Sequence, residues 1–216
     1  MIPLEKYAIY LVTDEPSRYK GDFVEAVEEA IDGGVTLVQY RDTESSGRIM
    51  YERAIRLRDM LVSRDIPLII NNYADLALAV EADGIHVGQS DMPVEVVRRI
   101  AGSKITVGLS ITNMEEARTI QSRSEIDYVG IGPVFDATKT KADAAPGMGL
   151  EGFKQIRHEL SDLPAIAIGG ITLELAQSII SAGADGLAIV SAFSKAESPR
   201  KVAERFAAYY RAGTAT

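Results

Sequence analysis

Cysteine is absent from the 216 residues, and long apolar runs are absent as well. Without cysteine the chain forms no disulfide and offers no thiolate as a nucleophile or a metal ligand. No window approaches the roughly 18 uninterrupted apolar residues that a membrane-spanning helix needs, so we expect no membrane partner. Residues 1–10 contain one acid and one base and lack the apolar core of a signal peptide, which favours a cytoplasmic location.

Positive charge is in deficit, because 23 Lys and Arg stand against 31 Asp and Glu, for a formal net charge of −8. Nucleic-acid-binding proteins need a basic footprint for the phosphate backbone, so we expect no nucleic-acid partner. An anionic ligand must be held by a local pocket rather than by the field of the whole protein. With 46% hydrophobic residues, the chain suits one core, and we expect a single domain over residues 1–216.

Eight short apolar runs alternate with longer amphipathic segments, as expected for buried parallel strands joined by helices. The predicted strands are Ala8–Val12, Thr36–Tyr40, Leu68–Asn71, Gly84–Val87, Ile105–Leu109, Tyr128–Ile131, Ala165–Ile168 and Gly186–Val190. Eight such units predict the α/β class and a single (β/α)8 TIM barrel. The alternative, an open doubly wound sheet, usually has a glycine-rich loop after its first strand, where this chain has Thr13-Asp14-Glu15-Pro16.

Segments with apolar residues at helical spacing lie between these strands. They are Phe23–Ile31, Met50–Ser63, Tyr73–Ala79, Val94–Ile100 and Pro199–Tyr210, with further helices starting at Met114 and near Leu173 and one that contains His158. Asn113 and Thr172 are expected to cap the two helices that follow them. Asp91 is expected to cap the helix that Pro93 opens.

Polar residues and glycines stand at nearly every predicted strand end, which packing alone does not explain. They are Asp14, Gln39, Arg41, Asn71, Asn72, Gln89, Asp91, Ser110, Thr112, Gly169, Gly170 and Ser191. Barrels place their functional groups at the C-terminal ends of the strands. The loops after the last two strands, with Gly169-Gly170 and Ser191, fit the phosphate site common in barrels, although the glycines could also serve only the turn.

Two further features suggest charged ligands. The loop from Gly132 to Gly149 carries Thr138-Lys139-Thr140-Lys141, which suits either a lid that closes over an anion or a solvated surface loop. Asn72 and Asp91 end neighbouring strands and could hold Mg²⁺ together with phosphate oxygens. His86 and His158, the two histidines, are interpreted as structural. The site then has no obvious general base and suits a reaction driven by stabilisation of a leaving group.

An ordered set of motifs resembles thiamine-phosphate synthases over nearly the whole chain. These motifs are Tyr10–Asp14, Gly34–Arg41, Leu68–Asn71, Asp83–Asp91, Asp127–Phe135, Ala167–Ile171 and Gly183–Ser191. The resemblance implies a magnesium-dependent transferase on a (β/α)8 barrel. Its small-molecule substrates are hydroxymethylpyrimidine diphosphate and hydroxyethylthiazole phosphate, and its products are thiamine phosphate and pyrophosphate. Pyrophosphate leaves first, and the thiazole nitrogen captures the resulting pyrimidine methyl cation.

The resemblance also implies residue roles. Arg41, Ser110 and Lys141 match catalytic positions. The positions implied to bind substrate are Gln39, Arg41, Asn71, Ser110 and Lys141 for the pyrimidine diphosphate and Thr138, Thr140, Gly170, Val190 and Ser191 for the thiazole phosphate. Asn72 and Asp91 match the ligands of the Mg²⁺ cofactor.

The chain departs from the family pattern at three places. Thr43 stands where lysine is usual, Asn72 where a second magnesium aspartate is usual, and Asp136 where proline is common, with one extra residue before Thr138. Each lost charge is expected to weaken binding of the magnesium diphosphate by roughly 1–3 kcal/mol. Lys139 and Arg41 are candidates to compensate for these losses.

Three alternatives remain from the sequence. A thiazole tautomerase-like isomerase shares the barrel but needs a proton-transfer residue, commonly a histidine after the fifth strand, where this chain has Thr112. A non-catalytic barrel that binds phosphate ligands fits the loss of charge at Thr43 and Asn72. A sugar-phosphate epimerase needs facing acid and base groups, which two histidines supply poorly. The sequence is compatible with a homo-oligomer but does not establish one.

Overall fold

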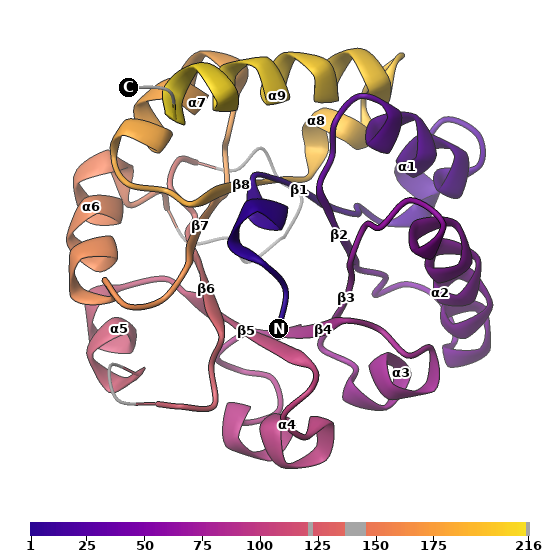
Figure 1. Ribbon diagram of the computed structural model, residues 1–216, viewed down its shortest axis with the longest axis horizontal. Helices are drawn as coiled ribbons and strands as arrows, with labels where there is room; N and C mark the ends of the chain where they lie inside the picture. The colour runs from indigo at the N-terminus through magenta and orange to yellow at the C-terminus, as the bar shows by residue number, and fades with distance from the viewer. Residues whose placement is uncertain (121–122, 137–145, 215–216) are drawn as a thin grey trace.

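The structure is a computed structural model that describes residues 1–120, 123–136 and 146–214. Eight parallel strands pair in chain order, and β8 pairs with β1 to close the barrel, as the predicted fold class requires. Figure 1 views the ring of strands from one end, with the helices outside it. The strands are β1 (Ile9–Val12), β2 (Leu37–Tyr40), β3 (Leu68–Asn71), β4 (Gly84–Val87), β5 (Thr106–Ile111), β6 (Tyr128–Ile131), β7 (Ala165–Ile168) and β8 (Gly186–Ile189).

Helices follow the strands and cover the outside of the barrel (Figure 1). They are α1 (Phe23–Asp32), α2 (Gly47–Val62), α3 (Ala74–Ala79), α4 (Val94–Ala101), α5 (Met114–Ile120), α6 (Gly149–Glu159), α7 (Leu173–Ser181), α8 (Ser191–Ser194) and α9 (Pro199–Thr214), with 3-10 helices η1 (Leu4–Tyr7) and η2 (Pro16–Arg18). Among the residues described, no helix has both the length and the apolar character to cross a bilayer.

Two apolar clusters hold the barrel together. The larger one fills the layer between the strands and the helices, because the outward side chains of each strand meet the apolar face of a helix. The smaller one fills the barrel interior and consists of Tyr7, Tyr10, Val12, Leu37, Ile69, Tyr128, Ile166 and Ala188. Since strand side chains alternate between faces, β1, β2, β3, β6, β7 and β8 contribute to both clusters, whereas the apolar residues of β4 and β5 belong to the larger one.

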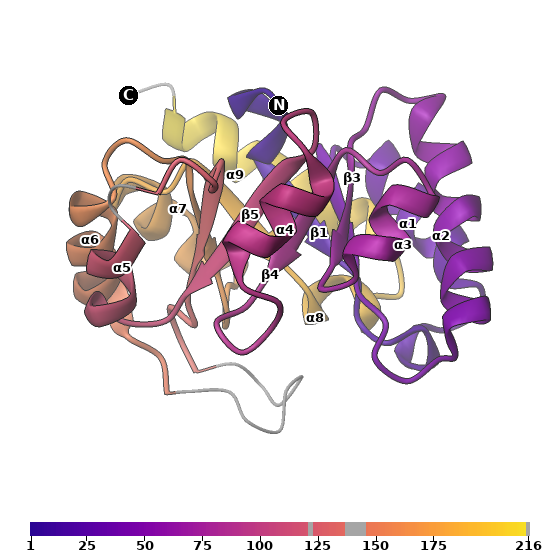
Figure 2. The ribbon, with the colours of Figure 1, turned by 90° about the horizontal axis from the view of Figure 1, so that it is seen from below.

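The two ends of the barrel differ. The helix η1 lies across the centre of the ring in Figure 1, and the backbone N–H of Ile2 donates to Thr106 Oγ1 at 3.0 Å. Figure 2 places this N-terminal segment and α8 at opposite ends of the strands. The N-terminal end is therefore covered by the chain itself, and the C-terminal ends of the strands carry the loops that can receive a ligand.

Two differences from the expected elements, and one agreement, concern residues near the site. The strand β5 extends to Ile111, so Ser110 lies within the strand and not after it. Asn113 caps α5 as predicted, because its Oδ1 accepts the N–H of Glu116 at 2.9 Å. The predicted cap by Asp91 is wrong. Pro93 occupies the N-cap position of α4, and the backbone N–H of Gly88 draws the Asp91 carboxylate back toward the end of β4 at 2.7 Å.

The cap predicted at Thr172 is confirmed in its position, but the expected side-chain hydrogen bond to the helix is not formed. Thr172 is the N-cap residue of α7, yet its side chain accepts no hydrogen bond from the helix backbone. The short helix α8 and the start of α2 at Gly47 were not predicted. A helix of four residues has too few positions to show a helical period in the sequence.

Candidate active site

A pocket opens inside the barrel and is lined by residues from all eight strands or the positions directly after them. Its lining residues are Tyr10, Val12, Gln39, Arg41, Asn71, His86, Ser110, Tyr128, Gly130, Ile166, Ile168, Ala188 and Val190. Five of the predicted site residues are thus brought together, namely Gln39, Arg41, Asn71, Ser110 and Val190. Apolar walls with a few convergent polar groups are typical of a small-molecule site.

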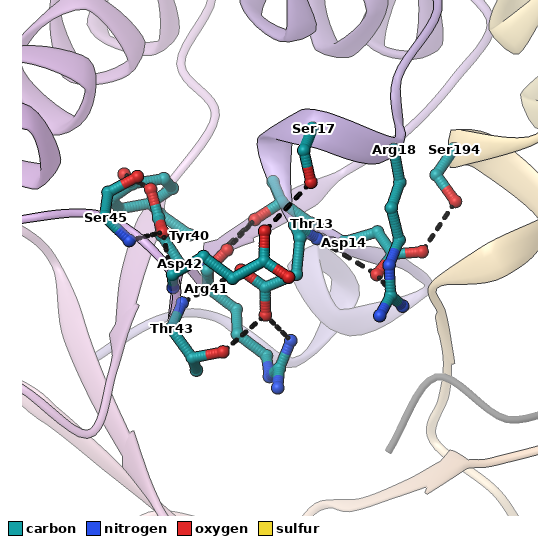
Figure 3. A network of polar contacts seen from close by, with 12 residues as sticks. Thr13, Asp14, Ser17, Arg18, Tyr40, Arg41, Asp42, Thr43, Ser45 and Ser194 are labelled. Carbon is teal, nitrogen blue, oxygen red and sulfur yellow. Dashed lines mark hydrogen bonds and ion pairs between the residues drawn. The ribbon is translucent and has the colours of Figure 1, made fainter. Parts of the chain in front are cut away.

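Arg41 is held in place by Glu15, a residue that the sequence analysis did not single out. Arg41 Nη1 lies 2.7 Å from Glu15 Oε1, and the Glu15 side chain is 3% exposed. Thr43 donates its hydroxyl to Glu15 Oε1 at 2.6 Å and its N–H to Glu15 Oε2 at 2.9 Å, and Figure 3 shows Arg41 and Thr43 side by side. Thr43, where the resemblance implies a lysine in the family, therefore helps to fix the carboxylate that orients Arg41.

Asp14 connects the loop after β1 to α8. Its Oδ1 accepts from Arg18 Nη1 at 2.9 Å, and its Oδ2 accepts from Ser194 Oγ at 2.8 Å (Figure 3). The residue is 1% exposed. Its carboxylate therefore acts in the support of the rim, not at the pocket surface.

Asp42 fixes the loop after β2. Its Oδ2 accepts from Tyr40 Oη at 2.9 Å and from Arg53 Nη1 of α2 at 2.8 Å. Burial of Asp42 opposes ionisation, but the hydrogen bonds from Tyr40, Ser45 and Arg53 outweigh it and hold the pKa of this carboxyl below its ordinary value. The loop that carries Arg41 is thus anchored to α2 by an ionised, buried side chain.

Replacing Asp42 with asparagine is expected to lower the free energy of unfolding at pH 7 by about 1–3 kcal/mol, the usual value of hydrogen bonds to a charged group. Because the folded pKa is depressed, this stabilisation is fully present above the unfolded pKa of about 3.9 and is lost as the pH falls through the folded value. Denaturant unfolding of wild type and Asp42→Asn from pH 7 to pH 3 should show the gap closing below about pH 4.

The control for this pH series is Asp59→Asn on α2, the helix that carries Arg53, since the Asp59 side chain is 68% exposed. It should leave stability nearly unchanged at every pH. A gap between wild type and Asp42→Asn that stayed constant to pH 3 would contradict the assigned pKa direction.

Asn72 and Asp91 meet at the ends of β3 and β4. Asn72 Nδ2 donates to Asp91 Oδ1 at 2.9 Å, and Asn72 has a φ of 66°, a left-handed conformation that asparagine tolerates. Within the described part of the chain, no group of three or more His, Cys, Asp or Glu side chains could hold a metal ion. One carboxylate and one amide oxygen still fit Mg²⁺, which commonly takes few protein ligands and completes its shell with phosphate oxygens and water.

A second pocket lies at the ends of β7 and β8. It is lined by Asp136, Gly169, Gly170, Ile171, Thr172, Ala188, Ile189, Val190, Ser191 and Ala192. Gly170 has a φ of 63°, and a Cβ added there would lie 2.8 Å from the carbonyl oxygen of Phe135, so the position requires glycine. The predicted phosphate residues Gly170, Val190 and Ser191 therefore lie together, and Ala188 and Val190 line both pockets.

His86 lines the barrel pocket, although the sequence analysis assigned it only a structural role. Its Nε2 lies 2.9 Å from Ser110 Oγ, and its Nδ1 lies 2.8 Å from Tyr128 Oη. The sequence did contain a signal for this placement. Side chains of a strand alternate between its two faces, and His86 lies between the outward residues Ile85 and Val87, so it faces the barrel interior. A histidine beside a predicted catalytic serine makes the pocket less poor in titratable groups than expected.

The predicted residues Thr138, Thr140 and Lys141, with Lys139, lie outside the described residues. The remaining candidates occupy three neighbouring places at the C-terminal end of the barrel. These are the barrel pocket, the glycine-lined pocket after β7 and β8, and the pair formed by Asn72 and Asp91.

Comparisons with known proteins identify the family of the chain. A family model described as thiamine monophosphate synthase matches residues 9–193. The thiamine-phosphate synthase of Chloroflexus aurantiacus is 46% identical over 192 residues, which cover 88% of this chain and 87% of that protein. The thiamine-phosphate synthase of Clostridium novyi is 42% identical over 189 residues, which cover 88% of this chain and 91% of that protein.

Solved structures give the same result. A thiamine phosphate pyrophosphorylase from Pyrococcus furiosus superposes with a TM-score of 0.88 at 35% identity, covering 97% of this chain and 98% of that chain. A 3-hexulose-6-phosphate synthase superposes with a TM-score of 0.65 at 16% identity and covers 93% of this chain and 99% of that chain, a likeness that shows the fold alone. By its family match and by these relatives, the chain belongs to the thiamine monophosphate synthase family.

Proposed function

We propose that the chain is a thiamine-phosphate synthase, a transferase that joins hydroxymethylpyrimidine diphosphate to hydroxyethylthiazole phosphate and releases pyrophosphate. The observation that carries this proposal is the adjacency of two pockets of different character. One is a barrel pocket with Gln39, Arg41 and Ser110, and the other is a glycine-lined pocket, with Val190 in the wall of both. Two ligands that must react with each other need neighbouring sites of this kind.

The barrel pocket suits the pyrimidine diphosphate. Arg41 offers a guanidinium fork that is already oriented by Glu15, and such forks match phosphate oxygens well. Negative charge develops on the diphosphate as the bond to the pyrimidine methylene carbon breaks. A positive group fixed in advance beside that charge stabilises the transition state without reorganisation.

Asn72 and Asp91 would hold Mg²⁺ against the diphosphate. The ion would neutralise charge on the leaving pyrophosphate. The amide of Asn72 now donates to Asp91, so it must turn its oxygen outward to serve as a ligand. In the proposed site, Arg41 supplies positive charge beside the diphosphate. This charge offsets part of what is lost at Thr43, which lacks the charge of a lysine, and at Asn72, which binds Mg²⁺ less strongly than an aspartate.

The glycine-lined pocket suits the thiazole phosphate. Glycine at position 170 leaves the backbone accessible, and Ser191 adds a hydroxyl. Thr138, Thr140 and Lys141 are proposed to complete this site and the diphosphate site, on the strength of their match to the family motif. We further propose that the enzyme acts on these two small-molecule substrates with one catalytic domain and that it is located in the cytoplasm.

The test is a product assay. Purified protein is mixed with both phosphorylated substrates and Mg²⁺, and thiamine phosphate is followed over time. We expect turnover that stops when EDTA is added. Binding of both substrates without product would instead favour a non-catalytic barrel, and rearrangement of the thiazole ligand alone would favour the isomerase.

Replacing Asn72 with aspartate is expected to raise the affinity for Mg²⁺ about tenfold, since a second carboxylate joins the site. Without metal, the two carboxylates repel each other, and the free energy of unfolding should fall by about 1 kcal/mol. Thermal unfolding with and without MgCl2, together with the Mg²⁺ dependence of turnover, measures both effects. Gln155→Glu, an equal charge change on the exposed face of α6, should show neither, and an Asn72→Asp protein indifferent to Mg²⁺ would refute the site.

A further inference from the structure

Five polar side chains form a continuous run of hydrogen bonds across the floor of the barrel pocket, which we name the interior chain. Gln39 Nε2 donates to Tyr10 Oη at 2.6 Å, and Tyr10 Oη lies 3.0 Å from Tyr128 Oη. Tyr128 Oη lies 2.8 Å from His86 Nδ1, and His86 Nε2 lies 2.9 Å from Ser110 Oγ. The five residues come from β2, β1, β6, β4 and β5.

Glycines make room for the interior chain. Gly108 pairs with His86 on one side and with Tyr128 on the other in the sheet register. A Cβ at Gly108 would lie 2.6 Å from His86 Nδ1 and would overlap the Tyr128 ring. On the next strand, a Cβ at Gly130 would lie 3.2 Å from His86 Cε1. The absence of side chains at both positions is what allows the tyrosine and the imidazole to meet.

The hydrogen bond from Gln39 sets the donor direction along the interior chain. Because the Tyr10 oxygen accepts from Gln39, the Tyr10 hydroxyl donates to Tyr128. The Tyr128 hydroxyl in turn donates to His86 Nδ1. The imidazole proton then lies on Nε2 and points at Ser110 Oγ. With Gln39 Nε2 facing Tyr10, the opposite direction would leave the Tyr10 hydroxyl proton with no acceptor among the described residues, at a side chain that is 2% exposed.

We propose that the interior chain holds Ser110 as a hydrogen-bond donor toward the ligand, which makes Tyr128 and His86 positioning residues. Because Ser110 Oγ already accepts from His86, its own proton is directed into the pocket that Ser110 lines. The carbonyl of Ser110 is fixed as well, since it accepts from Gln89 Nε2 at 2.7 Å. The acceptor is an atom of the pyrimidine diphosphate, and this identity alone rests on the proposed function.

The tyrosines serve orientation, not proton transfer. Burial raises the pKa of Tyr10 and of Tyr128 well above the ordinary value, so both hydroxyls keep their protons at neutral pH. Each can therefore pass on only the direction of a hydrogen bond. The interior chain spans the pocket, so that the amide of Gln39 on β2 determines which way the hydroxyl of Ser110 on β5 points.

The first test reads the tautomer of His86 by 15N NMR of the unliganded protein. The chain has two histidines, so the His158→Gln variant leaves His86 as the only signal. We expect the ring proton on Nε2. A proton on Nδ1 would overturn the proposal.

The second test removes one link. Tyr128→Phe should shift the His86 tautomer toward Nδ1–H and lower kcat/KM for the pyrimidine diphosphate about tenfold, the value of one hydrogen bond near 1.4 kcal/mol. In a Ser110→Ala background the same change should cost less than about twofold, because the effect acts through Ser110. Equal losses in both backgrounds would overturn the role assigned to Tyr128.

Tyr7→Phe is the matched control. The Tyr7 ring lies 5.0 Å from the Tyr128 ring, and Tyr7 is buried like Tyr128 but stands outside the interior chain. It should change neither the tautomer nor the kinetics. If the protein made no thiamine phosphate, the proposed function would fail, yet the tautomer of the unliganded protein would still decide the proposal. If Tyr128→Phe did not fold, the His86 tautomer in the protein with Tyr128 intact would likewise decide the proposal.

Discussion

Replacing Arg41 with methionine is expected to lower kcat/KM for the pyrimidine diphosphate about a thousandfold, because two charge-assisted contacts near 2 kcal/mol each are lost. Stability should fall as well. The Glu15 side chain is 3% exposed and 2.7 Å from the guanidinium, so removing Arg41 leaves a buried carboxylate without its countercharge, at a cost of about 3 kcal/mol. Initial-rate kinetics and denaturant unfolding measure the two effects separately.

The double variant Arg41→Met with Glu15→Gln separates binding from folding. Neutralising Glu15 should restore most of the lost stability and none of the lost activity. Arg56→Met is a matched control, because Arg56 pairs with Asp22 on the surface with a side chain that is 55% exposed, and it should change stability by less than about 1 kcal/mol. An Arg41→Met enzyme that kept a tenth of its activity would remove Arg41 from the proposed machinery.

Adding one methyl group at Gly108 is expected to be among the most damaging small changes in the chain. The new Cβ would overlap the ring of Tyr128, which is fully buried, and would approach His86 Nδ1 to 2.6 Å. Overpacking of this kind costs about 3 kcal/mol, which corresponds to a drop in Tm of roughly 6–12 °C for a chain of this size. Activity should fall further than stability explains, because Tyr128 and His86 are both displaced.

Gly47→Ala supplies the control for Gly108→Ala. A Cβ at Gly47 would meet nothing within 4 Å, and alanine at the start of α2 should change the free energy of unfolding by less than about 1 kcal/mol. Thermal unfolding of both variants tests the comparison. A Gly108→Ala protein as stable as Gly47→Ala would mean that β5 can move aside without loss.

The strands were predictable because parallel strands of a barrel are buried on both faces and so appear as continuous apolar runs. The rule ended β5 too early. Ser110 is polar yet lies inside β5, since it faces the pocket and not the apolar layer. The strand β4 was predicted with its observed bounds although it contains the polar His86, because the apolar residues Ile85 and Val87 flank that histidine.

The supporting residues were harder to predict than the ligand-facing ones. Arg41 and Gln39 could be selected because they lie at the end of a strand or directly after it and because they match a family motif. Glu15 could not be paired with Arg41 from the sequence, since the two residues are 26 positions apart and their contact depends on the β1–β2 register. Asp91 was assigned both to a helix cap and to a magnesium site, and the cap does not form because the backbone N–H three residues earlier binds its carboxylate.

Three acidic residues beside the pocket are each matched by an arginine. The pairs are Asp14 with Arg18 at 2.9 Å, Glu15 with Arg41 at 2.7 Å and Asp42 with Arg53 at 2.8 Å. An incoming anion therefore meets an edge with no surplus positive charge from these arginines, and long-range attraction adds little to its capture. Because salt screens unmatched exposed charges most strongly, association at this edge should vary only weakly with ionic strength.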